Sequence, residues 1–239
     1  MLTLMNISKR YGEQIVLNNL SVQFSEKGIS VIIGVNGSGK TTLMNLITGI
    51  EKLDSGDIRI EDQTFETRIF KRKIFYLPSD FFLPEFMTGI EYLKFITQRY
   101  EVLYKKENAE RLLTIFDLYS QKNQTIETYS FGMKKKIQII AAILSKAQYI
   151  LADEVLSGLD FETMILVHEI FSRISKDRAI IMITHDKQTI EAFDSEVYLL
   201  EKTVLQSTNK SADELVAYFR EGDIIHDKIN TFTQYMDNN

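Results

Sequence analysis

One short segment, Gly34 to Thr41, constrains the fold of this chain more than any other feature of its 239 residues. It reads GVNGSGKT and fits the pattern GxxxxGK[ST], between the apolar run Ile29–Val35 and the helical periodicity of Thr41–Thr48. Glycines let backbone N–H groups close around phosphate oxygens without a Cβ in the way, and the positive N-terminal end of a helix favours the same anion. The sequence therefore predicts a buried strand, a phosphate-binding loop and a helix that together bind a nucleoside triphosphate.

Two side chains of this loop have separate roles in that prediction. Lys40 carries an ammonium that reaches the β- and γ-phosphates, and Thr41 has a hydroxyl that can ligate Mg²⁺. The motif alone does not distinguish kinases, GTPases and ATP-driven motors. The alternative is a glycine-rich turn that happens to precede a helix, and the agreement of strand, loop and helix argues against it.

The composition leaves few glycines and prolines for ordinary loops. The chain has 11 Gly and 2 Pro, whereas average usage gives about 17 and about 12. This excludes collagenous, linker-rich and low-complexity chains. The absence of Cys excludes a disulfide scaffold, a thiolate metal site and a Cys nucleophile, and His168, His185 and His226 lie too far apart in sequence to indicate a local metal cluster.

The charge and the apolar runs narrow the possible partners and location. With 28 Lys and Arg against 33 Asp and Glu, the net charge of −5 favours no nucleic-acid partner. The N-terminus, MLTLMNISKRYGEQ, has no apolar signal core. The longest apolar run is Ile139–Leu144, far below the roughly 20 residues that a membrane span needs. We therefore expect a cytoplasmic chain that reaches a membrane only through a partner.

Hydrophobic periodicity predicts an α/β fold with a mostly parallel sheet, helices on both of its faces, and a small antiparallel sheet near the N-terminus. The predicted strands are Leu2–Tyr11, Ile15–Phe24, Ile29–Val35, Ile58–Thr64, Ile74–Leu77, Tyr149–Asp153, Ala179–Thr184 and Val197–Leu200. The predicted helices are Thr41–Thr48, Ile90–Tyr100, Lys106–Phe116, Phe131–Leu144, Glu162–Ile174 and Ala212–Phe219. We expect one domain over residues 1–239: a core of about 1–84 and 147–210, a helical insertion at about 85–146, and a tail at 211–239 that either docks or frays.

A second set of candidate residues ends the apolar strand Tyr149–Asp153. Asp153 is placed to hold Mg²⁺, and Glu154, one residue later, is placed to polarise an attacking water. A strand that ends in acidic residues at the surface is common in proteins. In a chain that already has a phosphate loop, we favour the functional interpretation.

Two further segments indicate a family. Ser157–Asp160 reads SGLD, and Ile181–Asp186 reads IMITHD, another buried strand with a polar tip. Together with the phosphate loop, these motifs resemble the ATPase subunits of ATP-binding-cassette (ABC) transporters, from Tyr11 to about Leu205. The resemblance implies a P-loop NTPase fold of the ABC-ATPase type, with an antiparallel β-subdomain and an inserted α-helical subdomain.

The resemblance also implies roles for individual positions. Tyr11 corresponds to the aromatic ring that stacks on adenine, Asp153 and Glu154 to the Walker B aspartate and catalytic glutamate, and His185 to the switch histidine that contacts the γ-phosphate. The segment Gly34–Thr42 is similar to the Walker A loop, which contributes Gly34, Asn36, Gly37, Ser38, Gly39, Lys40, Thr41 and Thr42 to nucleotide binding. The signature corresponds to Ser130–Met133 and contributes Ser130 and Gly132, while Ser157–Asp160 is similar to the D-loop, with Asp160 as a nucleotide contact. Lys40 joins Glu154 and His185 as catalytic, and Thr41, Asp153 and Ser79 are the expected Mg²⁺ residues.

The sequence departs from the family pattern at several of these places. Ser79 stands where the Q-loop normally has Gln, and its shorter side chain cannot approach Mg²⁺ or the attacking water in the same way; Asp80 or a bridging water are the candidate substitutes. In the signature, Phe131 replaces the first Gly, so that its ring would have to turn away from the nucleotide. Tyr129 and Met133 replace the signature's Leu and Gln, and Val155 replaces the Pro after the catalytic glutamate. We interpret these as marks of a divergent subclass.

The resemblance implies two kinds of protein partner. A second ABC ATPase subunit, identical or paralogous, would place its signature over ATP held by the Walker A loop of the first. A separate transmembrane subunit would bind at the apolar segment Pro78–Met87, whose aromatic residues have two open interpretations: packing of the hinge, or a groove for a short helix of that subunit. The run Lys134–Lys136 is expected to be a solvated face, with anionic lipid or a partner as the alternative.

The leading functional hypothesis is the ATP-binding and hydrolysing subunit of a membrane transporter, peripheral at the cytoplasmic face of the membrane, with ATP and Mg²⁺ as cofactors. The S-x-G-M signature and the single short cassette look like those of exporters of peptides, bacteriocins or drugs. The alternative is a soluble ABC-type ATPase with a role in assembly or regulation. A chromosome-organising cassette is disfavoured because no coiled coil interrupts the chain, and a tandem-cassette translation factor is excluded because there is one cassette.

Overall fold

The computed structural model describes residues 1–221, 231–232 and 235. Its strands are β1 (Leu2–Tyr11), β2 (Gln14–Phe24), β3 (Gly28–Ile33), β4 (Ser55–Ile60), β5 (Gln63–Thr64), β6 (Ile74–Leu77), β7 (Tyr149–Asp153), β8 (Ala179–Ile183), β9 (Ser195–Glu201) and β10 (Val204–Thr208). Its helices are α1 (Lys40–Thr48), α2 (Arg68–Lys73), α3 (Gly89–Arg99), α4 (Lys106–Ile115), α5 (Phe131–Ser145), α6 (Phe161–Ile174), α7 (Lys187–Ala192) and α8 (Ala212–Glu221), with 3-10 turns at Tyr119–Gln121 and Ile126–Thr128.

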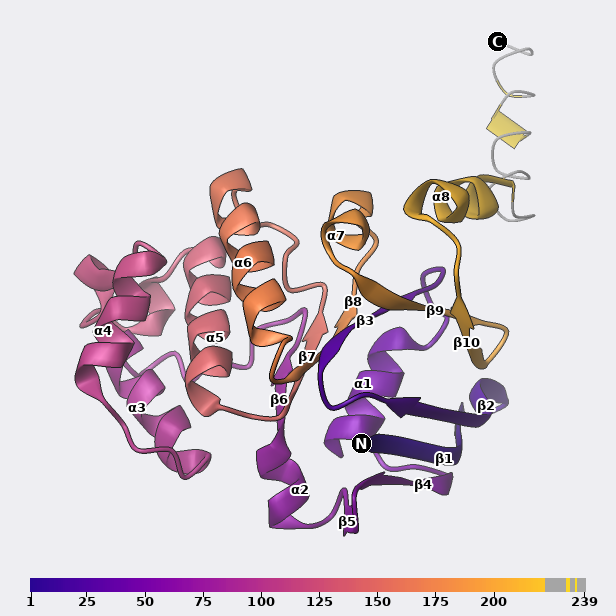
Figure 1. Cartoon of the computed structure of the whole chain (residues 1–239), viewed down its shortest axis with the longest axis horizontal. Helices are drawn as coiled ribbons and strands as arrows, with labels where there is room; N and C mark the ends of the chain where they lie inside the picture. The colour runs from indigo at the N-terminus through magenta and orange to yellow at the C-terminus, as the bar shows by residue number, and fades with distance from the viewer. Residues whose placement is uncertain (222–230, 233–234, 236–239) are drawn as a thin grey trace.

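These strands form two sheets (Figure 1). The first is antiparallel, with strand order β2-β1-β4-β5, and the second has the order β10-β9-β3-β8-β7-β6. In the second sheet only β10 runs antiparallel to its neighbour, β9. The predicted α/β class, with a mostly parallel sheet and a small antiparallel one, is therefore confirmed.

The strands of the parallel sheet are apolar throughout because both of their faces are covered. Val31 and Ile33 of β3 face a core that contains α5, whereas Ile32 between them faces a second core with α1 and the antiparallel sheet. In β7 the same alternation sends Ile150 to the first core and Leu151 to the second. Two hydrophobic cores therefore hold the sheet in place and leave the ends of its strands for function.

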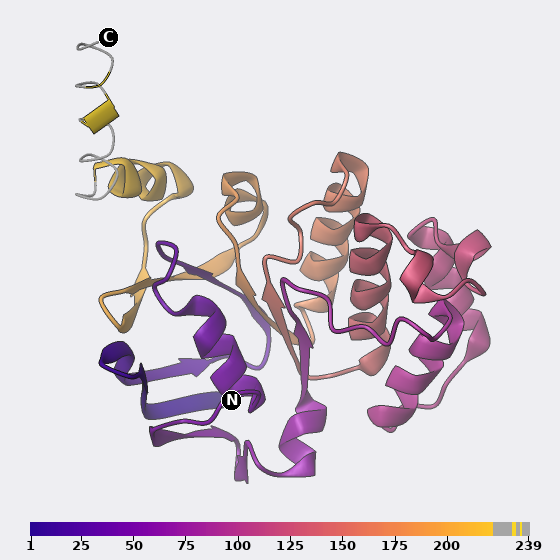
Figure 2. The same cartoon turned by 180° about the vertical axis from the view of Figure 1, so that it is seen from behind.

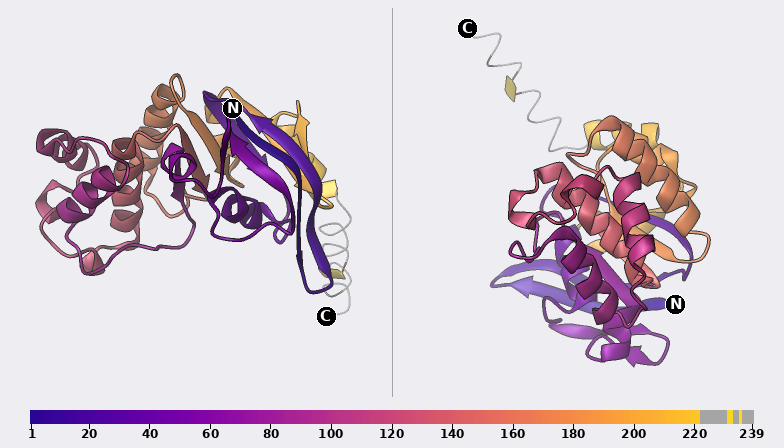
Figure 3. Two further views of the ribbon diagram at one scale, coloured as in Figure 1. Left: turned by 90° about the horizontal axis from the view of Figure 1, so that it is seen from below. Right: turned by 90° about the vertical axis from the view of Figure 1, so that its left-hand side faces the viewer.

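The helices α3, α4 and α5 gather at the end of the molecule opposite the antiparallel sheet (Figures 1 and 2). Residues 78–148, between β6 and β7, contribute no strand. At the other end, β2 lies beside β10, as the view from below shows (Figure 3). The helix α3 begins at a capping box in which Thr88 and Glu91 satisfy each other's backbone N–H groups.

Several predicted elements need correction. The predicted strand Ile58–Thr64 is wrong as one element: β4 and β5 are antiparallel partners, and the chain reverses at Glu61, which has φ +54°. The elements α2, α7 and β10 were not predicted. The first two are six residues long and are stabilised by N-caps, Thr67 and Asp186, whose side chains accept backbone N–H bonds. Within the predicted tail 211–239, α8 covers Ala212–Glu221, and residues 222–230, 233–234 and 236–239 lie outside the described residues.

Candidate nucleotide-binding and hydrolysis site

Four of the predicted functional segments meet at one edge of the parallel sheet. The strands β3, β6, β7 and β8 are parallel, so their carboxyl ends lie together. Asp153 pairs with Ile183, and Leu77 pairs with Ala152. The phosphate loop, the segment that begins at Pro78, the acidic pair and the Thr184–Asp186 tip therefore project from the same edge.

The phosphate loop leaves the N-terminus of α1 open to an anion. Gly39, the N-cap of α1, has φ +100°, and no side chain caps the helix. The first backbone N–H groups of the helix are therefore free of intrahelical partners and point outward. A Cβ at Gly39 would lie 2.6 Å from Cγ1 of Val16, so the tight packing of the loop also requires glycine there. The buried hydroxyl of Ser38 has no hydrogen-bond partner among the described residues, as expected for a group that awaits a ligand.

Lys40 lies across this loop with its ammonium buried. Its Nζ donates to the carbonyl oxygens of Gly34 and Val35 at 2.8 and 2.9 Å. Burial lowers the pKa of Lys40, and the charges of Glu154 and Asp153 act in the opposite direction. The ammonium thus lies beside the anion-binding loop, and the carboxylates of Glu154 and Asp153 favour its charged form.

Thr41 and Asp153 come together from segments 112 positions apart. The Thr41 hydroxyl donates to Oδ2 of Asp153 at 2.7 Å. Asp153 is buried, and its pKa is raised by burial, against the hydrogen bond from Thr41, which lowers it. A hydroxyl and a carboxylate at the edge of a phosphate loop fit Mg²⁺, which takes oxygen ligands and shares them with substrate phosphates. No group of three His, Asp or Glu side chains among the described residues forms a metal cage, so a bound ion would need the phosphates to complete its coordination.

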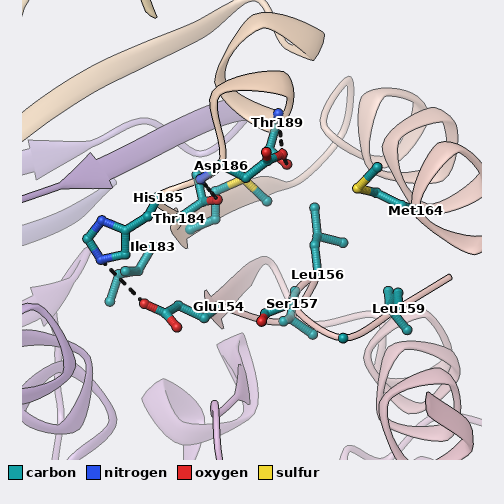
Figure 4. Close-up of a pocket in the computed structure, with 13 residues that line it drawn as sticks. Glu154, Leu156, Ser157, Leu159, Met164, Ile183, Thr184, His185, Asp186 and Thr189 are labelled. Atoms are coloured by element: carbon teal, nitrogen blue, oxygen red, sulfur yellow. Dashed lines mark hydrogen bonds and ion pairs between the residues drawn. The ribbon is translucent and has the colours of Figure 1, made fainter. Parts of the chain in front are cut away.

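Glu154 and His185 face one another at this edge (Figure 4). Glu154 has φ +49°, in the left-handed region, and its N–H donates to the carbonyl of Ile183 at 3.0 Å. This turn directs the carboxylate to Nε2 of His185, 3.4 Å away, and both side chains remain 42% exposed. Burial and the charge of Lys40 lower the pKa of His185, so its imidazole is neutral at pH 7. The pair therefore offers a carboxylate that can accept a proton and a neutral imidazole that can donate a hydrogen bond.

A cleft of about 480 Å³ connects the phosphate loop with Glu154, whereas His185 lines a neighbouring pocket that Glu154 also borders. Tyr11 lies at its outer end, where its hydroxyl donates to Glu51, and burial together with that carboxylate raises the pKa of the phenol. The predicted residues that line the cleft are Tyr11, Asn36, Gly37, Gly39, Lys40, Thr41, Thr42, Ser79, Asp153 and Glu154. Gln14 and Val16 also line it; their only signal in the sequence was the alternation of the strand in which they lie.

Five of the predicted nucleotide contacts do not line this cleft: Gly34 and Ser38 of the phosphate loop, and Ser130, Gly132 and Asp160. Ser130 is exposed at the N-terminus of α5, where its hydroxyl accepts from the N–H of Met133 at 3.3 Å. Gly132 has open space at its Cβ position. Asp160 caps α6 and accepts from the N–H of Thr163 at 2.8 Å, a bond that lowers the pKa of Asp160. Within one chain, the signature and the D-loop carboxylate are thus separate from the phosphate loop.

One departure from the family pattern, Phe131, contacts two other predicted functional segments. The ring of Phe131 lies against Gly158, where an added Cβ would be 2.6 Å from Cε1 of the ring. The same ring makes an edge contact with Phe81, with ring centroids 4.9 Å apart. The D-loop, the signature and the segment after Ser79 are therefore joined by aromatic packing within one chain.

The expectation that Lys134–Lys136 form a solvated face is wrong for Lys135. Lys135 is only 1% exposed, and its Nζ donates to the carbonyl of Ser79 at 3.2 Å. The helical spacing contained the signal, because Lys135 is four residues before Ile139 and seven before Ala142, both of which are buried.

The side chains of the aromatic segment Pro78–Met87 differ in their exposure. Phe81 packs on Phe131, and Leu83 packs against the core, whereas Phe82 and Phe86 are 80% and 79% exposed. Phe86 lines an open groove of about 500 Å³ with residues of α3, and the full lining is Phe86, Met87, Glu91, Lys94, Phe95 and Gln98. Hinge packing is therefore confirmed for Phe81 and Leu83, whereas Phe82 and Phe86 are on the surface.

The strand–loop–helix unit with an acidic pair on a neighbouring parallel strand defines the class of P-loop NTPases. A family model described as ABC transporter matches residues 17–157, more than half of the chain. The zinc import ATP-binding protein ZnuC of Rickettsia bellii (strain RML369-C) is 33% identical over 190 residues, covering 77% of this chain and 76% of that protein. The cytochrome c biogenesis ATP-binding export protein CcmA of Reclinomonas americana is 30% identical over 217 residues, covering 87% and 92%.

The fold agrees with a solved structure of the same kind. The dimeric structure of a post-hydrolysis state of an ATP-binding cassette bound to ADP and Pi matches with a TM-score of 0.77 and 23% identity, covering 87% of this chain and 98% of that chain. The chain belongs to the ABC transporter family, and it is an ATP-binding and ATP-hydrolysing cassette of that family. The predicted family, fold and ATP hydrolase class are confirmed. No helix in the described part of the chain is long and apolar enough to cross a membrane.

Proposed function

We propose that this cassette drives a separate membrane-spanning transporter subunit, and that it works as a pair with a second ABC ATPase subunit. We infer the pairing because the predicted nucleotide contacts lie in two separate places. The cleft is lined by the phosphate loop and the acidic pair, whereas Ser130 and Gly132 sit at an exposed helix end outside it. An exposed helix N-terminus binds anions, so a second cassette is the natural source of the phosphate that Ser130 would face. The partner is an identical copy or a paralogue.

The site residues then have defined roles. Tyr11 stacks on adenine, and Lys40 binds the β- and γ-phosphates after leaving its two carbonyl partners. The phosphates rest in a cradle formed by Gly34, Asn36, Gly37, Ser38, Gly39, Thr41 and Thr42. Thr41, Asp153 and Ser79 lie on the side of the cleft where Mg²⁺ would be held, and the ion supplies positive charge to the phosphate oxygens when bound. Ser130, Gly132 and Asp160 complete the site of the partner.

Hydrolysis follows from the Glu154–His185 pair. A water attacks the γ-phosphorus, the bond from that phosphorus to the bridging oxygen breaks, and ADP leaves. Glu154 accepts the proton of the water. His185 is neutral and donates a hydrogen bond to a γ-phosphate oxygen, and Lys40 balances the charge of the transferred group.

The groove beside α3 is the proposed docking site for the membrane subunit. Phe86 is 79% exposed and Phe95 45% exposed, and Glu91 and Lys94 border them. A short amphipathic helix fits such a surface, with apolar side chains in the groove and polar ones at its charged border. The groove lies in the helical segment of about residues 85–146, which we propose as a unit distinct from the core of about 1–84 and 147–210. Docking there would hold the chain at the cytoplasmic face of the membrane.

We further propose an exporter of peptide, bacteriocin or drug type. This assignment is supported by the S-x-G-M form of the signature. The curated relatives do not decide the direction, since one is named for import and another for export.

Co-purification tests the proposal. The tagged chain, extracted in mild detergent from its own cells, is expected to bring a polytopic membrane protein whose sequence identifies the transporter type. Phe86→Ser is expected to lose that partner, whereas Leu103→Ser, which alters a side chain that is 78% exposed outside the groove, is expected to keep it. Thermal unfolding of both variants shows that they are folded. Recovery of only soluble proteins would support the alternative, an ABC-type ATPase in assembly or regulation.

A further inference from the structure

The buried ammonium of Lys135 has no role in the site described above. Its Nζ makes one hydrogen bond, to the carbonyl oxygen of Ser79, and lies 5.6 Å from the ring centroids of both Phe81 and Phe131. Among the residues that the structure describes, no carboxylate lies within 4 Å of it. A buried cation with no directly paired anion is costly, because it loses its hydration.

The two neighbouring lysines show how differently Lys135 is placed. Lys134 pairs with Glu85 at 2.5 Å, and Lys136 pairs with Asp160 at 3.5 Å. Lys135 is directed inward instead, to the segment that forms one rim of the nucleotide cleft. Its aliphatic stem could be replaced by Met without a change in volume large enough to disturb the core. Packing alone therefore does not explain why a lysine stands here.

The surroundings of the ammonium point to the catalytic edge. Burial lowers the pKa of Lys135, and the negative charges of Asp153, Glu154 and Asp80 offset part of that effect. Phe81 and Phe131 flank the ammonium, which suits a cation that has little water around it. The charge thus lies between the helix that carries the signature and the carboxylates of the site.

We propose that Lys135 is a positioning residue for ATP hydrolysis: from α5 it holds the main chain at Ser79 in the rim of the nucleotide cleft. Ser79 has a short side chain, so the connection between this rim and the helical segment is made through its carbonyl oxygen. Lys135 thereby couples the position of the signature helix to the geometry of the site. This inference rests on the proposed function, because it assigns Lys135 to the site in which ATP is hydrolysed.

The first test compares kinetics with stability. Lys135→Met is expected to lower kcat about 10-fold, to change KM for MgATP by less than about 2-fold, and to leave the melting temperature unchanged or higher. Lys135→Arg keeps the positive charge and is expected to retain most of the wild-type kcat. If Lys135→Met does not fold, Lys135→Gln replaces it in the same comparison. Lys106→Gln, which removes a charge from a side chain that is 70% exposed, is the matched control and is expected to behave as wild type. A parallel loss of stability and kcat, or an unchanged kcat, would overturn the proposal.

The second test does not depend on hydrolysis. The chain has no Trp, so Phe82→Trp places a single Trp at an exposed position three residues after Ser79, and excitation at the red edge of Trp absorption avoids the 11 Tyr. In nucleotide-free protein, adding Lys135→Met is expected to lower the fluorescence anisotropy of this Trp, and adding Lys106→Gln is expected to leave it unchanged. Equal anisotropy in all three proteins would refute the positioning role even if ATPase activity is normal. An inactive wild type with a clear anisotropy difference would instead count against the proposed function alone.

Discussion

The phosphate loop allows a quantitative test of why glycine stands at position 39. Gly37 and Gly39 both have positive φ, +81° and +100°, in the same loop. An Ala at Gly37 would meet no atom within 4 Å, whereas an Ala at Gly39 would place its Cβ 2.6 Å from Cγ1 of Val16. The same substitution at the two positions therefore shares the backbone cost and differs in the steric overlap.

The expected magnitudes follow from these two terms. An L-residue in the left-handed region costs about 1–2 kcal/mol of unfolding free energy at either position. The overlap at Gly39 adds about 1–3 kcal/mol, the usual cost of overpacking. Gly37→Ala is thus expected to destabilise the chain by about 1–2 kcal/mol and Gly39→Ala by about 2–5 kcal/mol.

Urea unfolding measures both values, and a Val16→Ala background identifies the overlap. Because Val16→Ala removes Cγ1, Gly39→Ala is expected to cost about 1–3 kcal/mol less in that background, while the cost of Gly37→Ala stays the same. Titration calorimetry with MgATP is expected to show the larger loss of affinity for Gly39→Ala. Equal destabilisation by the two substitutions in the wild-type background, or no coupling with Val16, would refute this account of the loop.

Three further variants test the site. Glu154→Gln is expected to bind ATP, to lower turnover roughly 100- to 10,000-fold by removing the proton acceptor, and to accumulate as an ATP-dependent dimer in gel filtration; a monomer with full turnover would exclude the proposed mechanism. Lys40→Ala removes the ammonium from the loop and is expected to abolish measurable ATP binding by calorimetry, a result that normal affinity would contradict. Burial raises the pKa of Asp153, so the folded state loses stability as the pH rises through that raised pKa. Asp153→Asn is therefore expected to melt above wild type at pH 7 and level with it below the ordinary pKa of Asp, although its ATPase activity is lost; a lower melting temperature at pH 7 would show that burial of the charge is not costly.

The parts of the fold with strong local signals could be predicted from the sequence. The bounds of β1 and β6 agree with the predicted strands, and those of α1 and α5 differ by one residue. The motif around Lys40 implied its own strand and helix, and parallel strands bring their carboxyl ends together, which places Asp153 beside Thr41. Here periodicity, motif and topology all favoured the same arrangement.

Short elements and reversals were harder to predict because their signals are small or local to one residue. The chain reverses at Glu61, a non-glycine residue with positive φ, and nothing in the apolar pattern of Ile58–Thr64 indicates that turn. The helices α2 and α7 have too few residues for a periodicity, so only their caps identify them. β10 pairs only with β9 within its sheet, and a strand at an edge needs no continuous apolar run.

The burial of Lys135 was missed because the sequence suggests two opposite environments. A run of three lysines is typical of a solvated surface, yet the spacing to Ile139 and Ala142 indicates the buried face. In the structure Lys135 is buried, and even Lys134 and Lys136 are only 16% and 14% exposed and are held in ion pairs. The periodicity was therefore a better guide to the burial of this run than its charge.

The contacts of Lys40 show what ATP must change in this site. Its ammonium already donates to two carbonyl oxygens, so a phosphate gains only the difference between a charge-assisted bond and those two bonds. Burial lowers the pKa of Lys40, and the negative charge of a phosphate beside it would offset this penalty on the charged form. The buried hydroxyl of Ser38, which has no partner in the described structure, gains one at the same time. The loop thus favours an anion over a neutral ligand, because only an anion offsets the cost of burying the charge of Lys40.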